Sequence, residues 1–559
     1  TINESKQSSG TIDGIAVNYS NLVAPTSFKL LTVNYYDNYT IPTVTPATTV
    51  EGQTVATATK GLATGSWTRV ATTSAETKAE TSHILYDYKY RPIRTYTANY
   101  LGGYTGTDSK LDAFSGQLQY TVQKHKRTSG DTELSIKDAF TYSAQDRLLT
   151  HTHQINGGVV ELLAENTYDE LGKLTSKKVG NTSAAPLQKV DYNYNIRGWL
   201  KGINDIASLA KMSEPTDLFS FKINYNSPVT GGVTGVKELY NGNISETYWR
   251  TLKDNVLRKY GYSYDNLNRL NNAIYQKPGG NTYPTYEDYS EKNITYDKNG
   301  NIKSLLRNGD IEDALPASGI DNLVYTYATN SNKLSNVADT SNNTSGFNDF
   351  NKEGYDYSYD ANGNLITDKN KKISAITYNH LNLPTKIIFP TGNIMYIYNA
   401  AGQKVQKVVT ENTTVITTDY LGGYQYKNTV LQYFPHAEGY YDDVKKVYVY
   451  NYTDHLGNVR ISYTKDATTG SLKILEENNY YPFGLKHNSY NVDNFQPEYK
   501  YKFQGQERQD ELGLNWDSFK WRNYDYAIGR FMSIDPLATD FPQWSPYVFS
   551  GNLVTMTRE

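Results

Sequence analysis

The stretch "YDANGNLITDKNKKI", residues Tyr359 to Ile373, decides how the chain is expected to fold. It joins a Tyr-Asp pair to an Asn-Gly turn and to a run that alternates apolar and polar residues. Related phrases recur: "YDKNGNIKSLLRN" begins at Tyr296 and "YDELGKLTSKKV" at Tyr168. Asn-Gly and similar pairs tolerate the positive φ that tight turns between twisted strands require. Each copy therefore predicts a strand, a turn and a second strand.

The phrase is repeated along most of the chain, with a turn-forming residue four places after a Tyr. Clear copies begin at Tyr142, Tyr168, Tyr194, Tyr264, Tyr296, Tyr359, Tyr378 and Tyr398; Thr453 takes the Tyr position of another, and degenerate copies begin at Tyr86 and Tyr327. Successive copies commonly lie about 20 to 32 residues apart, and self-similarity at such a period indicates a stacked array. An unrelated set of Tyr-rich hairpins would not be expected to produce so many copies.

The array predicts a mostly β protein whose tandem hairpins roll into a spiral β-cocoon, that is, a hollow shell. A single wide sheet would accumulate twist and expose edges that aggregate, whereas rolling hides its faces. With strands about 4.8 Å apart and a rise of about 3.3 Å per residue, the closed wall would enclose room for a chain of about 100 residues. That space is much larger than a small-molecule pocket.

The composition excludes several classes of function. The chain has 559 residues, of which 55 are basic and 58 acidic, and its net charge is -3. We therefore predict no positively charged surface that would attract nucleic acid. It has no Cys, which excludes disulfides and thiol chemistry. No apolar run is long enough to span a membrane. The N-terminal residues lack a signal-peptide pattern, and we expect the chain to be a piece of something longer. No cofactor-binding fingerprint occurs.

Two segments outside the repeats carry predictions of their own. Residues 1–80 are rich in Thr, Ala and Val and are expected to form strands and loops that start or cap the sheet. Asn204 to Met212, "NDIASLAKM", is the best helix candidate, because Pro215 would stop it.

Two patterns resemble metal sites only weakly, and neither is predicted to bind a metal. Asp297 and Asp360 imitate the start of a calcium loop, but Asn308 and Lys371 stand where an EF-hand needs Glu, so turns are predicted. His151 and His153 would share one strand face, but without a third ligand they are expected to be solvent-exposed and to bind no metal.

From about residue 450 the Tyr-Asp repeats give way to a series of long motifs. They include "DHLGN", "YPFG", "FQGQERQDELGLNWD", "RNYDYAIGRFMSIDP" and "SPYVFSGN". This order resembles the RHS-repeat-associated core of the RHS/YD-repeat family over roughly Tyr452 to Asn552, and the Tyr-Asp repeats extend the resemblance back to about Tyr86. The resemblance divides the chain into an N-terminal cap segment (1–80), a YD/RHS-repeat shell (81–450) and the core (451–559).

The resemblance implies a bacterial, secreted or cell-surface polymorphic toxin shell, similar to the C component of Tc toxins and to the shell of teneurins. Its partners would be its own C-terminal toxin or effector, held inside, and a secretion machinery. The family core plugs the shell and cuts the chain just downstream, as a single-turnover aspartyl-type autoprotease. No cofactor and no metal are implied.

Carried over residue by residue, the family chemistry points to Asp535 in "GRFMSIDP" as the catalytic acid, with Arg530 as its positioning neighbour. The family's second acid lies in a D-P-x-G-L motif, and Glu559 falls near its first position. Neither the Pro nor the Gly-Leu is present here, so Asp540 is the substitute candidate. Two carboxyls that share a proton can act as acid and base on an amide. Without the resemblance, Asp535-Pro536 would simply be a turn.

Two other functions remain open at this stage. Tyr-rich sheets also bind sugars, so a carbohydrate-binding or adhesive cell-surface protein without protease activity is the main alternative. A purely structural shell that has lost self-cleavage is another. A distinct domain encoded beyond Glu559 would favour encapsulation over adhesion.

Overall fold

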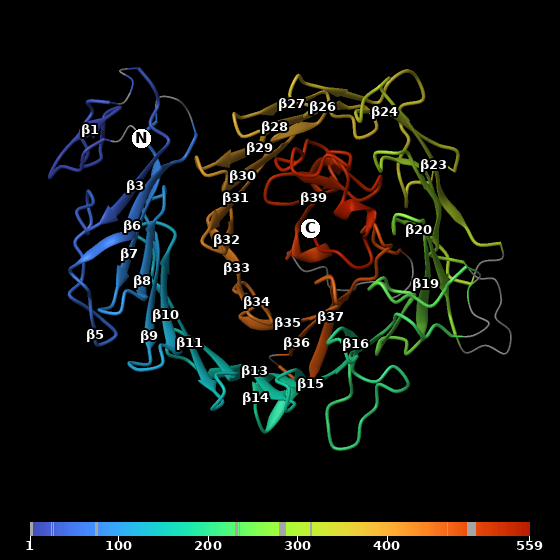
Figure 1. The fold of residues 1–559 in the computed structure, drawn as a ribbon, viewed down its shortest axis with the longest axis horizontal. Coiled ribbons are helices and arrows are strands. Elements are labelled where there is room, and N and C mark those ends of the chain that lie inside the picture. Colours follow the sequence, from blue (N-terminus) through green and yellow to red (C-terminus); the bar gives the residue numbers. More distant parts are fainter. Residues whose placement is uncertain are drawn as a thin grey trace.

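The computed structural model of the protein describes residues 4–23, 25, 27–72, 76–229, 233, 235–278, 287–313, 316–341, 343–466, 468–488 and 499–559. In these ranges the chain forms antiparallel strands, three single-turn 3-10 helices and no α-helix. Figure 1 shows the strands arranged as a ring, with the C-terminal residues inside it. The prediction of a mostly β, spiral cocoon of hairpins is confirmed.

An outer ribbon makes the first turn of the spiral, and its strands pair in chain order. They are β3 (Thr32–Asp37), β6 (Thr59–Arg69), β7 (Ala79–Tyr86), β8 (Pro92–Ala98), β9 (Tyr104–Leu111), β10 (Leu118–Lys126), β11 (Leu134–Tyr142), β12 (Leu148–Ile155), β13 (Val160–Tyr168), β14 (Leu174–Thr182), β15 (Ala185–Tyr194), β16 (Leu200–Ile203), β17 (Phe219–Asn224), β18 (Glu246–Thr251), β19 (Arg258–Tyr264), β20 (Leu270–Gln276), β21 (Glu291–Tyr296), β22 (Ile302–Asn308), β23 (Gly319–Tyr327) and β24 (Leu334–Asp339).

An 11-stranded inner sheet continues the path. It contains β27 (Ala375–Tyr378), β28 (Pro384–Phe389), β29 (Gly392–Tyr398), β30 (Lys404–Glu411), β31 (Thr414–Leu421), β32 (Tyr424–Lys427), β33 (Val430–His436), β34 (Gly439–Asp442), β35 (Val447–Thr453), β36 (Val459–Lys465) and β37 (Leu472–Glu477). Three hairpins complete the wall: β1 (Thr11–Ile12) with β2 (Ile15–Ala16), β4 (Thr49–Val50) with β5 (Gln53–Thr54), and β25 (Tyr357–Tyr359) with β26 (Leu365–Asp368).

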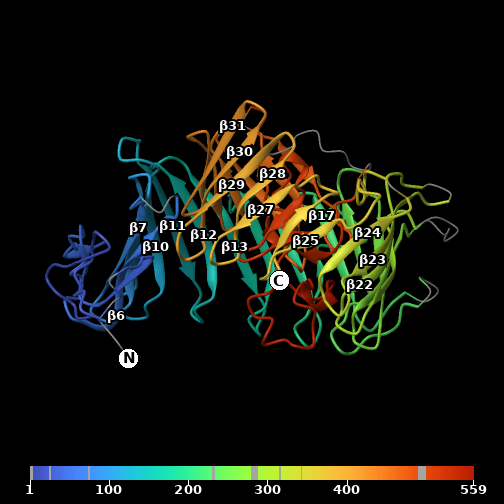
Figure 2. The same cartoon turned by 90° about the horizontal axis from the view of Figure 1, so that it is seen from above.

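The spiral makes more than one turn, so part of the wall is double. The ribbon passes from β3 through β13 to β15, then β19 to β24, and returns as the inner sheet beside β7 to β13 (Figure 1). Seen from above, β27 to β31 cross in front of β11 to β13 (Figure 2). An isolated bridge between Val70 and Asn399 joins the two layers directly.

The Tyr-Asp pair works through its aspartate, which closes the turn. Asp297 accepts hydrogen bonds from the backbone N–H groups of Asn299 (2.8 Å) and Asn301 (2.9 Å), and its own carbonyl accepts one from Gly300 (3.2 Å). Gly300 has φ +85°, a conformation that suits glycine. A side-chain oxygen accepts from the residue four places on at Asp87, Asp169, Asn195, Asp265, Asp297, Asp360, Asn379, Asn399 and Asp454. These Asp and Asn side chains therefore stabilise turns, as predicted for Asp297 and Asp360.

The tyrosine of the pair links one repeat to the one before it. The Tyr296 hydroxyl donates to the carbonyl of Leu270 at 2.6 Å, and Tyr327 does the same to Ile302 at 2.6 Å. Equivalent bonds come from Tyr168, Tyr264 and Tyr378. Because a buried carbonyl without a partner is unfavourable, each hydroxyl helps to stack successive hairpins.

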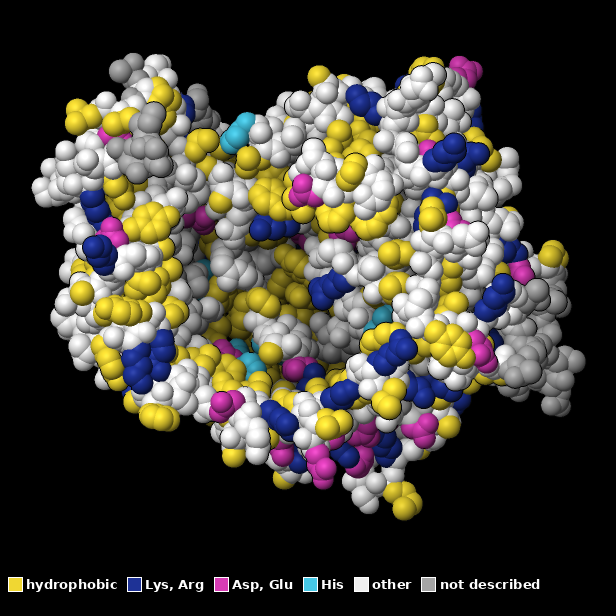
Figure 3. Space-filling model, in the orientation of Figure 1, with side chains coloured by type: hydrophobic (Ala, Val, Ile, Leu, Met, Phe, Trp, Pro, Cys, Tyr) yellow, Lys and Arg dark blue, Asp and Glu magenta, His cyan; other side chains and the backbone are white. Residues whose placement is uncertain are grey.

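Residues 478–488 and 499–559 form a plug inside the ring. The plug contains β38 (Glu507–Gln509), β39 (Trp516–Ser518), β40 (Asn523–Asp525), β41 (Arg530–Phe531) and 3-10 helices at Phe503–Gly505, Glu511–Gly513 and Ser550–Asn552. Arg307, fully buried on β22, donates to the carbonyl of Ala527 in the plug at 2.7 Å. The space-filling view shows the ring hollowed beside the plug (Figure 3). The interior is thus shared between the plug and open space.

Two local predictions are wrong. Residues 204–212 form bends and no helix, because Asn204 adopts φ +59° and donates to the carbonyl of Phe219 at 2.8 Å. Lys211, on the same segment, pairs with Asp191 at 2.5 Å, so contacts with the wall override helix propensity. His153 is not solvent-exposed: it is 2% exposed and its Nδ1 lies 2.9 Å from the hydroxyl of Tyr448 on the inner sheet.

Candidate functional site

Asp535 lies in a turn of the plug that follows β41. Its backbone N–H donates to the carbonyl of Pro546 at 2.9 Å, and its Oδ1 accepts from the N–H of Leu537 at 2.8 Å. Its Oδ2 lies 2.9 Å from Nη2 of Arg522, and the side chain is 30% exposed. Asp535 is therefore held in place, with one oxygen paired to a cation and access to solvent.

Glu559 reaches the same arginine. Its Oε1 pairs with Nη2 of Arg522, and its Oε2 accepts from the N–H of Ser550 at 2.9 Å. Its backbone N–H donates to Oε1 of Gln504 at 2.9 Å. The structure therefore brings Asp535 and Glu559 together on one guanidinium nitrogen.

Arg522 is the residue of this site that sequence reasoning missed. It precedes β40, is 8% exposed, and its guanidinium lies 3.7 Å from the centre of the Phe531 ring. Burial lowers the pKa of Arg522, while Glu559 and Asp535 oppose that effect. Its Nη1 is buried without a hydrogen-bond partner. The motif "WRNYDYAIGRF" holds two arginines, and its spacing alone does not say which one meets Asp535.

Arg530 has a different setting. Its guanidinium bonds Oδ1 of Asn301 at 3.2 Å and the carbonyl of Asn332, and it lies 4.4 Å from the centre of the Tyr547 ring. Asn301 belongs to the repeat turn described above, so Arg530 connects the plug to the wall. The cation that pairs with Asp535 is Arg522.

Asp540 lies outside this group of charges. It is exposed, and its backbone N–H donates to the carbonyl of Leu537 at 2.9 Å. The structure does not bring it to Arg522. Among the described residues, no group of three or more His, Asp or Glu could hold a metal ion.

Space for a peptide exists next to Arg522. A pocket of about 610 Å³ is lined by Trp521, Arg522 and Ser533 from the plug and by Tyr378 and Tyr398 from the wall. Its mixed polar and aromatic lining and its size suit a short segment of polypeptide.

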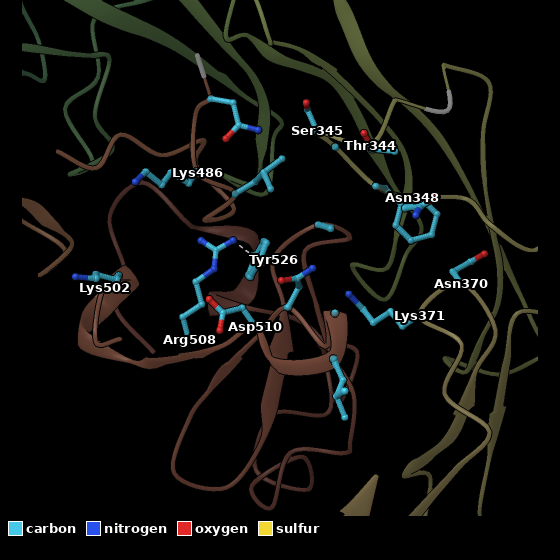
Figure 4. A pocket seen from close by; sticks show the side chains of 18 of the residues that line it. Thr344, Ser345, Asn348, Asn370, Lys371, Lys486, Lys502, Arg508, Asp510 and Tyr526 are labelled. Atoms are coloured by element: carbon cyan, nitrogen blue, oxygen red, sulfur yellow. Dashed lines mark hydrogen bonds between the residues drawn. The ribbon is translucent and has the colours of Figure 1, made fainter. Parts of the chain in front are cut away.

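A second pocket of about 610 Å³ lies between the plug and the other side of the wall (Figure 4). Lys371 projects into it from the wall, and Arg508, bonded to the Tyr526 hydroxyl, faces it from the plug. Lys371 is paired with Asp525 at 3.1 Å. Lys371 thus links the wall to the plug, whereas Arg508 is bonded within the plug.

In chemical terms the site is an ion-paired triad. Two acids that share one proton can activate water, but here the guanidinium stands between them. For hydrolysis, one carboxylate would have to exchange its contact with Arg522 for a proton. The structure supplies two carboxylates, a cation between them, and a pocket that Arg522 lines and that neither acid lines.

The part of the chain that the structure describes contains no helix of the length and apolar character that a membrane crossing requires.

Sequence comparison finds no matching protein-family model and no matching curated protein. Solved structures do match. The structure of the Photorhabdus luminescens Tc holotoxin pore, with an aspartate-to-alanine mutation in TccC3, has a TM-score of 0.62 at 15% identity, covering 94% of this chain and 26% of that one. TcdB2-TccC3 without its hypervariable C-terminal region has a TM-score of 0.55 at 13% identity, covering 91% and 31%. This chain thus spans about a quarter to a third of their length, and by its fold it is similar to part of a Tc toxin protein.

Proposed function

We propose that the chain belongs to an RHS-type hollow shell that encloses a polypeptide effector, a toxin, and that it cuts itself near Glu559 to free it. The observation that carries the proposal is the meeting of Asp535 and Glu559 on Arg522 inside the ring. The C-terminal end lies within the ring in Figure 1, so a polypeptide joined to Glu559 would begin there. The likeness to Tc toxin proteins supports enclosure as the purpose of such a fold.

Self-cleavage fits the geometry better than turnover of a free substrate. The acids belong to the plug, which lies inside the ring of strands (Figure 1). A scissile bond that is part of the same chain is held next to them, which makes the reaction unimolecular and raises its effective concentration greatly. In the proposed step, one group acts as an ionised carboxylate and accepts a proton from water, the resulting hydroxide adds to the peptide carbonyl, and the other group, a protonated carboxyl, gives its proton to the leaving amine as the C–N bond breaks.

The sugar-binding alternative gains no support from the repeat tyrosines. Tyr264, Tyr296 and Tyr327 pack against the core and donate their hydroxyls to backbone carbonyls. A sugar-binding platform needs aromatic faces that are open to solvent.

The test is expression of the chain with its natural continuation, followed by a denaturing gel and intact mass measurement. Wild type is expected to run as two pieces, with the break near Glu559, and Asp535→Asn as one. Asp540→Asn is the matched control, because Asp540 is exposed and away from Arg522; it is expected to split like wild type.

Each other result contradicts a defined part of the proposal. If wild type stays whole, self-cleavage is wrong, while enclosure can still be tested by protection of the downstream part from added protease. If Asp535→Asn splits, Asp535 is not the acid. If the downstream part is digested at once in the folded protein, enclosure is wrong.

A further inference from the structure

The two layers of the wall meet along a surface that we call the overlap seam, between outer strands β9 to β13 and inner strands β31 to β35. Hydrogen bonds join the two layers, from His125 to Tyr426, from His153 to Tyr448 and from Tyr450 to Glu161. The seam has an apolar cluster that includes Ile136 from the outer layer and Leu421 and Phe434 from the inner layer. Ion pairs also cross it, such as Arg127 with Asp419 at 2.8 Å. Closure of the ring at this side depends on these contacts.

Imidazole rings are concentrated in the seam. His125 on β10 is 1% exposed, stacks on Tyr424 with ring centres 3.7 Å apart, and has Nε2 2.9 Å from the Tyr426 hydroxyl. His153 on β12 bonds Tyr448 across the seam, as described above. His436 on β33 lies 6.1 Å from His153, ring to ring, and its Nε2 is buried without a hydrogen-bond partner. Three of the eight histidines of the chain thus lie where the two layers touch.

Several charged and titratable groups lie around these rings, and some of them are paired with one another. His151 pairs with Asp138 at 2.7 Å, and Glu161 accepts from the Tyr450 hydroxyl at 2.6 Å. Asp131 lies near His125, and Arg127 and Asp419 lie near its partner Tyr426. Asp138 and His151 lie near His153, and Glu161 lies near its partner Tyr448. Near His436 lie His151, His153, Tyr448 and Tyr450, and the backbone N–H of Glu438 donates to its Nδ1 at 3.3 Å. Burial is the main effect that disfavours a second proton on each ring, and Asp131 near His125 and Asp138 near His153 oppose it; charges on His153 and His436 would repel each other.

We propose that the overlap seam is an acid-opened closure: protonation of His125, His153 and His436 separates the inner layer from the outer layer and opens the side of the shell. This proposal does not depend on self-cleavage. The proposed trigger is the protonation of wall histidines, and it does not involve Asp535 or Glu559 of the plug.

The direction of the pH effect follows from the difference in histidine pKa between the closed and the open seam. Burial lowers the pKa of His125 to about 4 and that of His436 to about 3, and it also lowers the pKa of His153. An imidazole released into water titrates near 6.5. The closed seam is therefore fully favoured above about pH 6.5 and loses that advantage as the pH falls toward 4. At pH 5, His125 alone shifts the equilibrium toward the open seam about 30-fold.

The test is a distance across the seam, measured by pulsed electron resonance between two spin labels. The chain has no cysteine, so Gln119→Cys on β10 and Val430→Cys on β33, both exposed, would carry the only labels. At pH 7.5 one short, narrow distance distribution is expected. At pH 5 a longer, broader distribution is expected, and the change should reverse on return to pH 7.5.

Replacing the three histidines by Gln, which can still donate and accept but does not titrate, should keep the distribution short at both pH values. His380→Gln, on an exposed residue, is the matched control and should open like wild type. A wild-type distribution that is unchanged at pH 5, or a triple variant that opens as wild type does, would overturn the proposal. If the triple variant is already open at pH 7.5, the wild-type titration decides: a midpoint outside pH 4 to 6.5 also overturns it. Asp535→Asn should open normally, which separates this proposal from self-cleavage.

Discussion

The wall and the plug are held by bonds of very different reach along the chain. In the wall, Asp297 bonds residues two and four places away, and Tyr296 bonds a residue 26 places away. In the plug, the Tyr481 hydroxyl bonds the carbonyl of Asn308, 173 residues away, and the Tyr547 hydroxyl bonds that of Gly363, 184 residues away. Apart from the overlap seam, the wall is a sum of similar local units, whereas the plug is defined by contacts with a wall that must already exist.

The wall turns and the contact with the plug also differ in how deeply their charged groups are buried. Wall carboxylates such as Asp297 are partly exposed and serve turns, while the contact with the plug contains fully buried ions. Although burial raises the pKa of Glu507, Lys404 and Lys407 lower it to about 2. A buried ion pair contributes little net stability, but loss of one partner is strongly destabilising. Changes at the contact between wall and plug should therefore exceed changes within the wall.

The largest effect is expected from Arg307→Met. Arg307 pairs with Glu291 at 2.6 Å and Asp321 at 2.9 Å, all three fully buried, so its removal leaves two buried carboxylates without their cation. Stability should fall by about 3–5 kcal/mol. Denaturant unfolding measures it, with Lys303→Met, exposed on the same strand, as the control. A loss no larger than that of the control would mean that the plug does not depend on this ion cluster.

The pH dependence at Asp368 should come next. Burial raises the pKa of this wall residue to about 7, with Lys371 opposing and Asp525 of the plug reinforcing the shift. The pKa is higher in the folded than in the unfolded state, so this contribution is present at low pH and is lost as the pH rises through 7. Asp368→Asn cannot ionise, so its stability relative to wild type should grow by about 2.5 kcal/mol between pH 5 and 8. Parallel pH profiles for the two proteins would contradict this.

Two glycines of the repeat turns allow a turn that contacts the plug to be compared with one that contacts only the wall. Gly363 and Gly172 have similar φ values, +81° and +84°, but a Cβ on Gly363 would lie 2.5 Å from Ile534 and 2.8 Å from the Tyr547 hydroxyl of the plug. A Cβ on Gly172 would meet only the flexible end of Arg147. Both Gly→Ala changes should cost about 1–2 kcal/mol for the left-handed backbone. Gly363→Ala should cost about 1–3 kcal/mol more through overpacking, and should make the plug easier to digest.

The smallest effect is expected from Tyr296→Phe, which removes one link between neighbouring repeats. The carbonyl of Leu270 then loses its partner, at a cost of about 1 kcal/mol. Thermal unfolding measures this, and Tyr88→Phe, at an exposed tyrosine, is the control. A loss of about 3 kcal/mol or more would mean that the repeats are far more cooperative than a sum of local units.

The sequence predicted the wall well and the site in part. Tyr-Asp spacing identified the hairpins because an Asp, a turn residue and a Tyr act within a few residues of one another. The helix at Asn204–Met212 was wrong because contacts from β15 and β17 determine that segment. Asp535 and Glu559 were singled out through a family resemblance, and the structure places them on one cation. Their catalytic role stays a prediction.

What the sequence alone determined is the repeating unit, because turn geometry and strand alternation are properties of neighbouring residues. What only the tertiary structure decided is where the spiral overlaps itself and which distant groups then meet. Arg522 rather than Arg530 pairs with Asp535, and His153 faces Tyr448 instead of water. These outcomes depend on the cumulative twist and curvature of many hairpins, and no short stretch of sequence encodes that sum.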